Sequence, residues 1–111
     1  MLPEDAIQLT QRWAEDRTPV EFRDRIKVEV ETHPRGLSIV ECSLMPNVDR
    51  ETGWLCVPRA RLGYSSGTGD WTLYWFDRNS KVRRYPDFET SKAIQDLLDE
   101  IENDSWCIFW G

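Results

Sequence analysis

Hydrophobic residues recur at helical spacing in two segments, one near each end of the chain. The first runs from Pro3, which suits the first turn of a helix, to Arg17, because the residue before Pro19 is disfavoured in a helix. The second begins at Thr90 or Ser91, either of which can cap a helix, and runs to about Asn103. Charged side chains lie opposite each apolar stripe, so both segments are predicted to be amphipathic helices that cover a sheet. The two stripes are Leu2, Ala6, Leu9 and Trp13, and then Ala93, Ile94, Leu97, Leu98 and Ile101.

Between these helices apolar and polar residues alternate, which is typical of strands with one buried face. Turn-forming residues divide this region into strands at about 25–31, 37–44, 54–64, 71–76 and 81–85. Pro58 predicts a bulge, or a position where its missing donor faces no neighbour. The apolar end, Trp106 to Gly111, is predicted to be a short terminal strand or a docked tail. The pattern therefore predicts one α+β domain over residues 1–111: an N-terminal helix, an antiparallel meander of about five strands, and a C-terminal helix.

Alternation also predicts how the first two strands pair. An odd-numbered loop with Gly36 in the left-handed conformation would place one apolar set of the second strand opposite the first strand. That pairing joins Ile26, Val28 and Val30 to Leu44, Cys42 and Val40. The competing apolar set of the second strand is Leu37 and Ile39.

The other two hairpins carry the aromatic residues. On the core face, Trp71, Leu73 and Trp75 are expected to meet Tyr64, Leu62 and Ala60. A four-residue turn at 77–80 would then place Phe76, Tyr74 and Thr72 opposite Lys81, Arg83 and Tyr85. With this pairing, aromatic and basic side chains gather on the face opposite the core.

Charge supports a distinct role for that face. The net charge is −6, yet residues 54–86 hold six basic and two acidic groups, a net of +4. The remaining residues hold eight basic and eighteen acidic groups, a net of −10. We hypothesise a binding site there, because Arg and Tyr are typical of binding interfaces. Its residues are Arg59, Arg61, Tyr74, Phe76, Lys81, Arg83 and Tyr85.

Several chemistries have no support in the sequence. Cys42, Cys56 and Cys107 lie far apart in apolar stretches, which predicts packed thiols in a reduced, cytoplasmic protein without a membrane segment. His33 is the only histidine, so no metal site and no cofactor is expected. A pair such as Glu41 and Arg61 is expected to be an ion pair, so no catalytic residue is assigned and an enzyme is the weakest class.

The basic-aromatic face leaves three functional interpretations beside a plain structural one. The structural one is a solvated sheet face, where Arg stems cover aromatic rings. The favoured function is a non-catalytic binding or regulatory module, whose partner is a protein or a second copy of the chain. The alternative is a nucleic-acid-associated protein, in which bases stack on tyrosines and phosphates pair with arginines. A small enzyme of unknown reaction comes third, and no membrane partner is expected.

An ordered series of short motifs resembles a known family. The motifs are Pro58-x-Ala60-Arg61-x-x-Tyr64, Trp71-x-Leu73-Tyr74-Trp75, Lys81-x-x-Arg84-Tyr85, and Asp104 followed by Phe109-Trp110-Gly111. Together they resemble the bacterial domain-of-unknown-function family numbered 3024, over about Ile26 to Gly111. That family usually has Lys at Arg61, an aromatic residue at Val82, His at Arg83, and Arg-Pro where Cys42-Ser43 follow Glu41. The resemblance implies a small bacterial cytoplasmic protein, and the family has no assigned activity.

Overall fold

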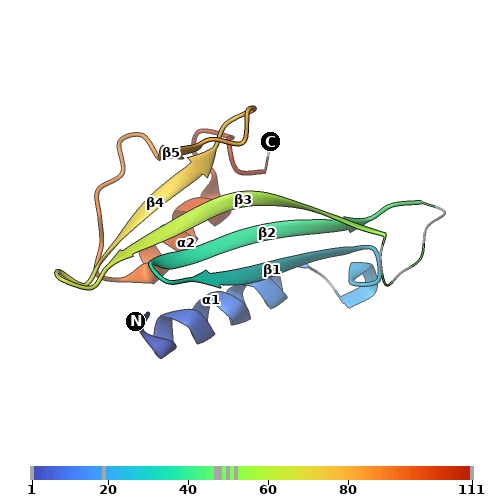
Figure 1. The fold of residues 1–111 in the computed structure, drawn as a ribbon, viewed down its shortest axis with the longest axis horizontal. Coiled ribbons are helices and arrows are strands. Elements are labelled where there is room, and N and C mark those ends of the chain that lie inside the picture. Colours follow the sequence, from blue (N-terminus) through green and yellow to red (C-terminus); the bar gives the residue numbers. More distant parts are fainter. Residues whose placement is uncertain (1, 19, 47–48, 50, 52, 111) are drawn as a thin grey trace.

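Along the chain, one helix precedes and one helix follows a five-stranded antiparallel sheet, whose strands lie in sequence order (Figure 1). This arrangement confirms the predicted α+β fold. The computed structural model describes residues 2–18, 20–46, 49, 51 and 53–110, so Gly111 of the predicted tail lies outside them. The helices are α1 (Glu4–Arg17) and α2 (Ile94–Asn103), and a short 3-10 turn (Val20–Phe22) follows α1. The strands are β1 (Ile26–His33), β2 (Gly36–Leu44), β3 (Trp54–Ser65), β4 (Asp70–Phe76) and β5 (Val82–Arg84). No helix of the described residues is long and apolar enough to cross a membrane.

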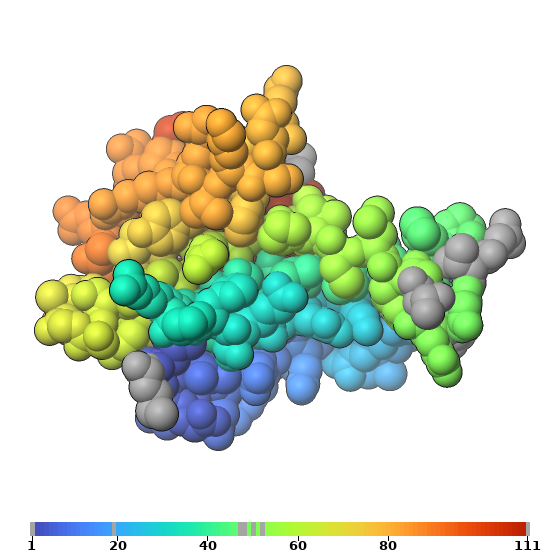
Figure 2. Space-filling model, viewed as in Figure 1, coloured from blue at the N-terminus to red at the C-terminus, as the bar shows by residue number. Residues whose placement is uncertain are grey.

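Both helices pack on one face of the sheet, which we call the inner face. Ala6 and Ala14 of α1 join Leu97 and Leu98 of α2 in the same buried cluster as the inner-face strand residues. Each fully buried Leu or Ile contributes roughly 1.5–3 kcal/mol relative to an exposed one, so this cluster is the core of the fold. In Figure 2, residues of β1, β2 and β3 cross the middle of the view, and α1 is seen along the lower border. We call the side of the sheet opposite the helices the outer face.

The central hairpin has the register that alternation predicts. Ala60, Leu62 and Tyr64 of β3 pair with Trp75, Leu73 and Trp71 of β4. Trp71 and Leu73 are each only 2% exposed. Both expectations for Pro58 hold as well. The β2–β3 register shifts beside it, and β4 pairs with β3 only from Ala60 onward, so no described strand faces Pro58 on that side.

The register predicted for the first hairpin is wrong by one residue. Val28 pairs with Glu41 and Val30 with Ile39, instead of Cys42 and Val40. The loop contains two residues, Pro34 and Arg35, and Gly36 is already the first residue of β2, paired with His33. A one-residue change of register exchanges the two faces of a strand. Leu37 and Ile39 therefore belong to the core, and Val40 and Cys42 lie on the outer face.

The register predicted for the last hairpin is also wrong by one residue. Phe76 pairs with Val82, Trp75 with Arg83 and Tyr74 with Arg84. The Asp77 N–H donates to the Lys81 carbonyl at 3.0 Å, which leaves three loop residues instead of four. Ser80, the last of these, has φ 62°, as in three-residue hairpin loops that close with a left-handed residue.

Helix α2 begins later than the capping residues predict. Ser91 forms a bridge with Trp71: each residue donates its N–H to the other's carbonyl, at 3.0 and 2.7 Å. The Ser91 hydroxyl still accepts the Ala93 N–H at 3.1 Å, but the first helical residue is Ile94. The side chain that could cap the helix is thus fixed at the edge of the sheet.

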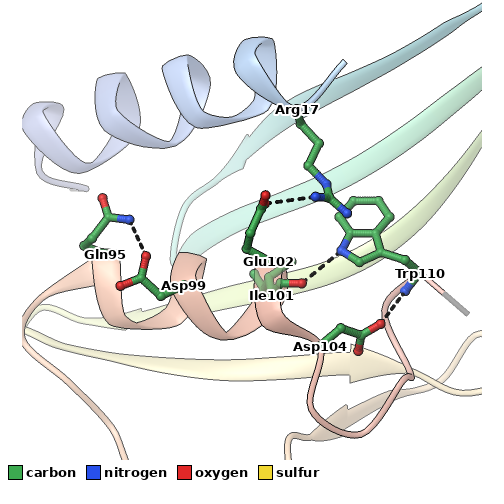
Figure 3. Close-up of polar contacts among 7 residues, drawn as sticks. All are labelled: Arg17, Gln95, Asp99, Ile101, Glu102, Asp104 and Trp110. Atoms are coloured by element: carbon green, nitrogen blue, oxygen red, sulfur yellow. Dashed lines mark hydrogen bonds and ion pairs between the residues drawn. The ribbon is translucent and has the colours of Figure 1, made fainter. Parts of the chain in front are cut away.

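The C-terminal segment is a docked tail and not a strand (Figure 3). Asp104 accepts three backbone N–H groups, from Ile108, Phe109 and Trp110, at 2.9–3.1 Å. The Trp110 indole N–H donates to the Ile101 carbonyl at 2.9 Å, and the Arg17 guanidinium lies 4.3 Å from the Trp110 ring centroid. Phe109 is 1% exposed, so the tail completes the core.

The cysteines contradict the prediction of three packed thiols. Cys42 and Cys56 face each other in β2 and β3, with Cα atoms 4.0 Å apart, and form a disulfide. Cys107 is free and exposed. The two bonded residues are 14 positions apart, so the sequence shows their proximity only once the β2–β3 register is known.

Candidate functional site

A row of polar and basic residues crosses the outer face from β2 to β5. Ser38 pairs with Arg61, Arg61 with Tyr74, and Tyr74 with Arg84. We call Ser38, Arg61, Tyr74 and Arg84 the basic row. Directly paired residues on one face have Cβ atoms roughly 5 Å apart, so Tyr74 has a guanidinium-bearing side chain on each side.

Gly63 in β3 gives the Tyr74 ring its place. A Cβ atom at Gly63 would stand 2.9 Å from the ring atom Cε2 of Tyr74, so the ring lies over the glycine backbone. An aromatic side chain that covers a strand glycine in this way supports the sheet where the glycine has no side chain to pack. A larger residue at position 63 would displace the ring from between the two arginines.

A shallow hollow of about 290 Å³ opens beside the basic row. Arg35 and Arg61 line it together with Tyr74, and the hydroxyls of Ser65 and Thr72 add hydrogen-bonding groups. Within the described part of the chain, no carboxylate forms an ion pair with Arg35, Arg61 or Arg84. The hollow is therefore cationic and can accept an anionic group.

Three of the seven predicted site residues lie on the outer face of the central strands. Arg61 and Tyr74 are in the basic row, and Phe76 pairs with Val82 one position along. Arg59 is the extra residue at the β2–β3 bulge, between Pro58 and Ala60. Its guanidinium donates to Glu41 at 2.7 and 3.2 Å, so its charge is already compensated.

Two further predicted residues lie near the last turn: Lys81 directly precedes β5, and Arg83 is the middle residue of β5. The Arg83 guanidinium donates to Asp77, and the Lys81 backbone N–H donates to the same carboxylate at 3.0 Å. These bonds hold the pKa of Asp77 below its usual value, and the bond from Arg83 has the larger effect. Because Arg83 pairs with Trp75, it lies on the inner side, and its placement in the site is wrong.

Tyr85 is a core residue, and its placement in the site is also wrong. It is 2% exposed, its ring stacks on Phe109 with centroids 4.9 Å apart, and its hydroxyl donates to Glu100 at 2.6 Å. Burial, and then the bond to Glu100, raise the pKa of Tyr85 well above 10. Burial alone would raise the pKa of Glu100, but the bonds from Tyr85 and Ser105 hold it below its usual value. This pair anchors the tail and does not line the hollow.

Sequence reasoning missed Arg84 and Arg35. Arg84 reaches the outer face because the last loop has three residues, and Arg35 is the second residue of the two-residue β1–β2 turn. A signal for the first was the sequence Asp77-Arg78-Asn79-Ser80, since Asn and Ser tolerate turn conformations that close short loops. The imagined pair of Glu41 and Arg61 does not form, because Glu41 binds Arg59.

A second hollow, of about 350 Å³, lies between the starts of α1 and α2, where Tyr64 and Trp71 line it. Two of its polar side chains already have partners: Lys92 binds the Thr68 carbonyl at 2.6 Å, and Gln95 binds Asp99 at 2.8 Å (Figure 3). The described residues contain no group of three or more His, Cys, Asp or Glu side chains arranged to hold a metal ion. The outer face remains the best candidate.

The family of this chain follows from a match over almost its whole length. The profile described as "Domain of unknown function (DUF3024)" matches residues 2–111. The chain belongs to this family. No curated protein and no solved structure matches the sequence. In this DUF3024 chain, motif residues divide between the two faces: Trp71, Leu73 and Phe109 are buried in the core, whereas Arg61 and Tyr74 lie in the basic row.

Proposed function

We propose that the protein is a non-catalytic binding module that holds an acidic segment of a partner protein on its outer face. The observation that carries this proposal is the position of Tyr74 between Arg61 and Arg84, on the face opposite α1 and α2. A ring between guanidinium groups combines apolar contact with charge, and Tyr and Arg are enriched in binding hot spots. The resemblance to bacterial cytoplasmic proteins supports a cytoplasmic setting for this module.

The charges around the row favour an acidic protein segment over a nucleic acid. A single-stranded nucleic acid needs a groove that follows its backbone over several phosphates. The basic row has only one residue from each strand, so it offers no such groove. Near its β2 end lie Glu29 and Glu31 of β1. Residues outside 54–86 carry a net charge of −10, which would repel a longer polyanion. A short acidic segment can cross the row without meeting these groups.

Fluorescence anisotropy with defined probes tests the proposal. The probes are a labelled peptide of Asp and Glu residues with one Phe, the same peptide with Asn and Gln, and a single-stranded oligonucleotide. The site variant is Arg61→Gln with Arg84→Gln. The control variant is Arg12→Gln with Arg25→Gln, which removes the same charge from two exposed residues of α1 and the segment before β1. We expect the acidic peptide alone to bind, and each lost site arginine to weaken it about tenfold.

Each other outcome changes the proposal in a defined way. Equal weakening in both double variants would mean that only net charge matters and that the outer face is not the site. Tighter binding of the oligonucleotide, with steep salt dependence and loss in the site variant, would replace the protein partner by a nucleic acid. Absence of binding by every probe would contradict the proposal. A second copy of the chain as the partner stays a separate prediction.

A further inference from the structure

We propose that Cys42 and Cys56 form a reversible thiol–disulfide exchange site for low-molecular-weight thiols, in which Cys56 is the sulfur that an incoming thiolate attacks. The pair joins β2 to β3, where Cys42 and Cys56 stand opposite each other in the ladder. This site is separate from the basic row, because the β2–β3 bulge at Arg59 lies between the disulfide and Arg61. The inference does not depend on the proposed binding function.

The two cysteine residues differ in their exposure to solution. Cys42 is 1% exposed, whereas Cys56 is exposed. Cys42 has a neighbouring strand on each side, since Lys27 of β1 pairs with it opposite Cys56. No described strand lies on the far side of Cys56, because β4 pairs with β3 only from Ala60 onward. Exchange rates depend on which sulfur a thiolate can reach, so attack is directed to Cys56.

The sheet keeps the two sulfurs opposite each other after the bond is broken. Pairing continues on both sides of the disulfide, through Glu41 with Val57 and through Ser43 with Leu55. A freed Cys42 thiol therefore stays beside Cys56 and can close the disulfide again. The exposed Cys107 has no such partner, because the described chain holds its other two cysteines in this pair.

The chemistry balances with a small thiol as the only co-reactant. A thiolate attacks the sulfur of Cys56, the protein S–S bond breaks, and Cys42 leaves as a thiolate that takes up a proton. A second thiolate then attacks the small-molecule sulfur of the mixed disulfide and releases Cys56. The protein gains two electrons and two protons, and two small thiols become one small disulfide.

Peptide mapping by mass spectrometry tests the order of attack, with oxidised glutathione as the probe. In the folded Cys42→Ser variant, Cys56 should accumulate the glutathione adduct at a rate similar to that of Cys107. In Cys56→Ser, Cys42 should react about tenfold more slowly than Cys107 in the same molecule. Circular dichroism checks folding, and Cys42→Ala replaces Cys42→Ser if the hydroxyl is not tolerated.

The wild-type protein provides a test without substitution. Reduced glutathione should open the disulfide without denaturant, and oxidised glutathione should restore Cys42–Cys56 with no more than a transient adduct. Cys107 should keep its adduct in the same sample. A disulfide that opens only in denaturant, equal reactivity of Cys42 and Cys56, or stable adducts on both would each overturn the proposal.

Discussion

Leu73 and Tyr74 are consecutive in β4, yet they belong to opposite sides of the molecule. Leu73 is 2% exposed and pairs with Leu62 in the core, whereas the half-buried Tyr74 pairs with Arg61 and Arg84 on the outer face. The inner residue is constrained by close packing from the sheet and the helices. The outer residue has to satisfy only its cross-strand neighbours. The difference shows where this fold can carry a binding function without a large loss of stability.

The largest effect is expected from truncation on the inner side. Leu73→Ala should lower the free energy of unfolding by about 3 kcal/mol, because it removes a buried side chain and leaves a cavity. Urea unfolding followed by tryptophan fluorescence measures this change, with the slope against urea compared between the two proteins. A loss below about 1 kcal/mol would mean that the site collapses or that Leu73 is not in the core.

An intermediate effect on the free energy of unfolding should appear at alkaline pH. This effect tests whether Tyr85 belongs to the inner side. The pKa of Tyr85 is raised in the folded protein above its ordinary value of 10. Its contribution to the free energy of unfolding is therefore complete below pH 10 and decreases above it. The free energy of unfolding should fall by up to about 1.4 kcal/mol per pH unit from this residue. Tyr85→Phe should reduce this dependence of stability on pH. An unchanged dependence in Tyr85→Phe would contradict the assignment.

The three hairpins differ in how far the sequence determines their register. The central one was predicted correctly because β3 and β4 each offer one apolar set there, led by Leu62 and Leu73, and a slip of one residue would expose one of the two sets. Strand β2 is apolar on both faces, with Ile39 on one and Val40 on the other. Strand β5 has Val82 as its only aliphatic residue. In these two hairpins one loop residue decides the register, and alternation carries no information about loop length.

The candidate site divides along the same line. Arg61 and Tyr74 could be predicted because they stand in the central hairpin, whose register follows from burial. Arg84 was missed, because its place depends on a left-handed Ser80 that shortens the last loop. The disulfide depends on pairing across the β2–β3 bulge, which places Cys42 opposite Cys56. Pro58 indicated a bulge, but not which residue would be the extra one.

The smallest change in stability is expected on the outer face. Tyr74→Ala should cost about 1 kcal/mol or less in urea unfolding, since it removes cross-strand contacts and no fully buried group. The same variant should weaken binding of the acidic peptide at least as much as the loss of one arginine does. The reason is that the Tyr74 ring provides the apolar contact between Arg61 and Arg84. A loss of stability equal to that of Leu73→Ala would show that the outer face is packed like the inner one. In that case the basic row would be a structural feature of the sheet, and the binding function would have to lie elsewhere.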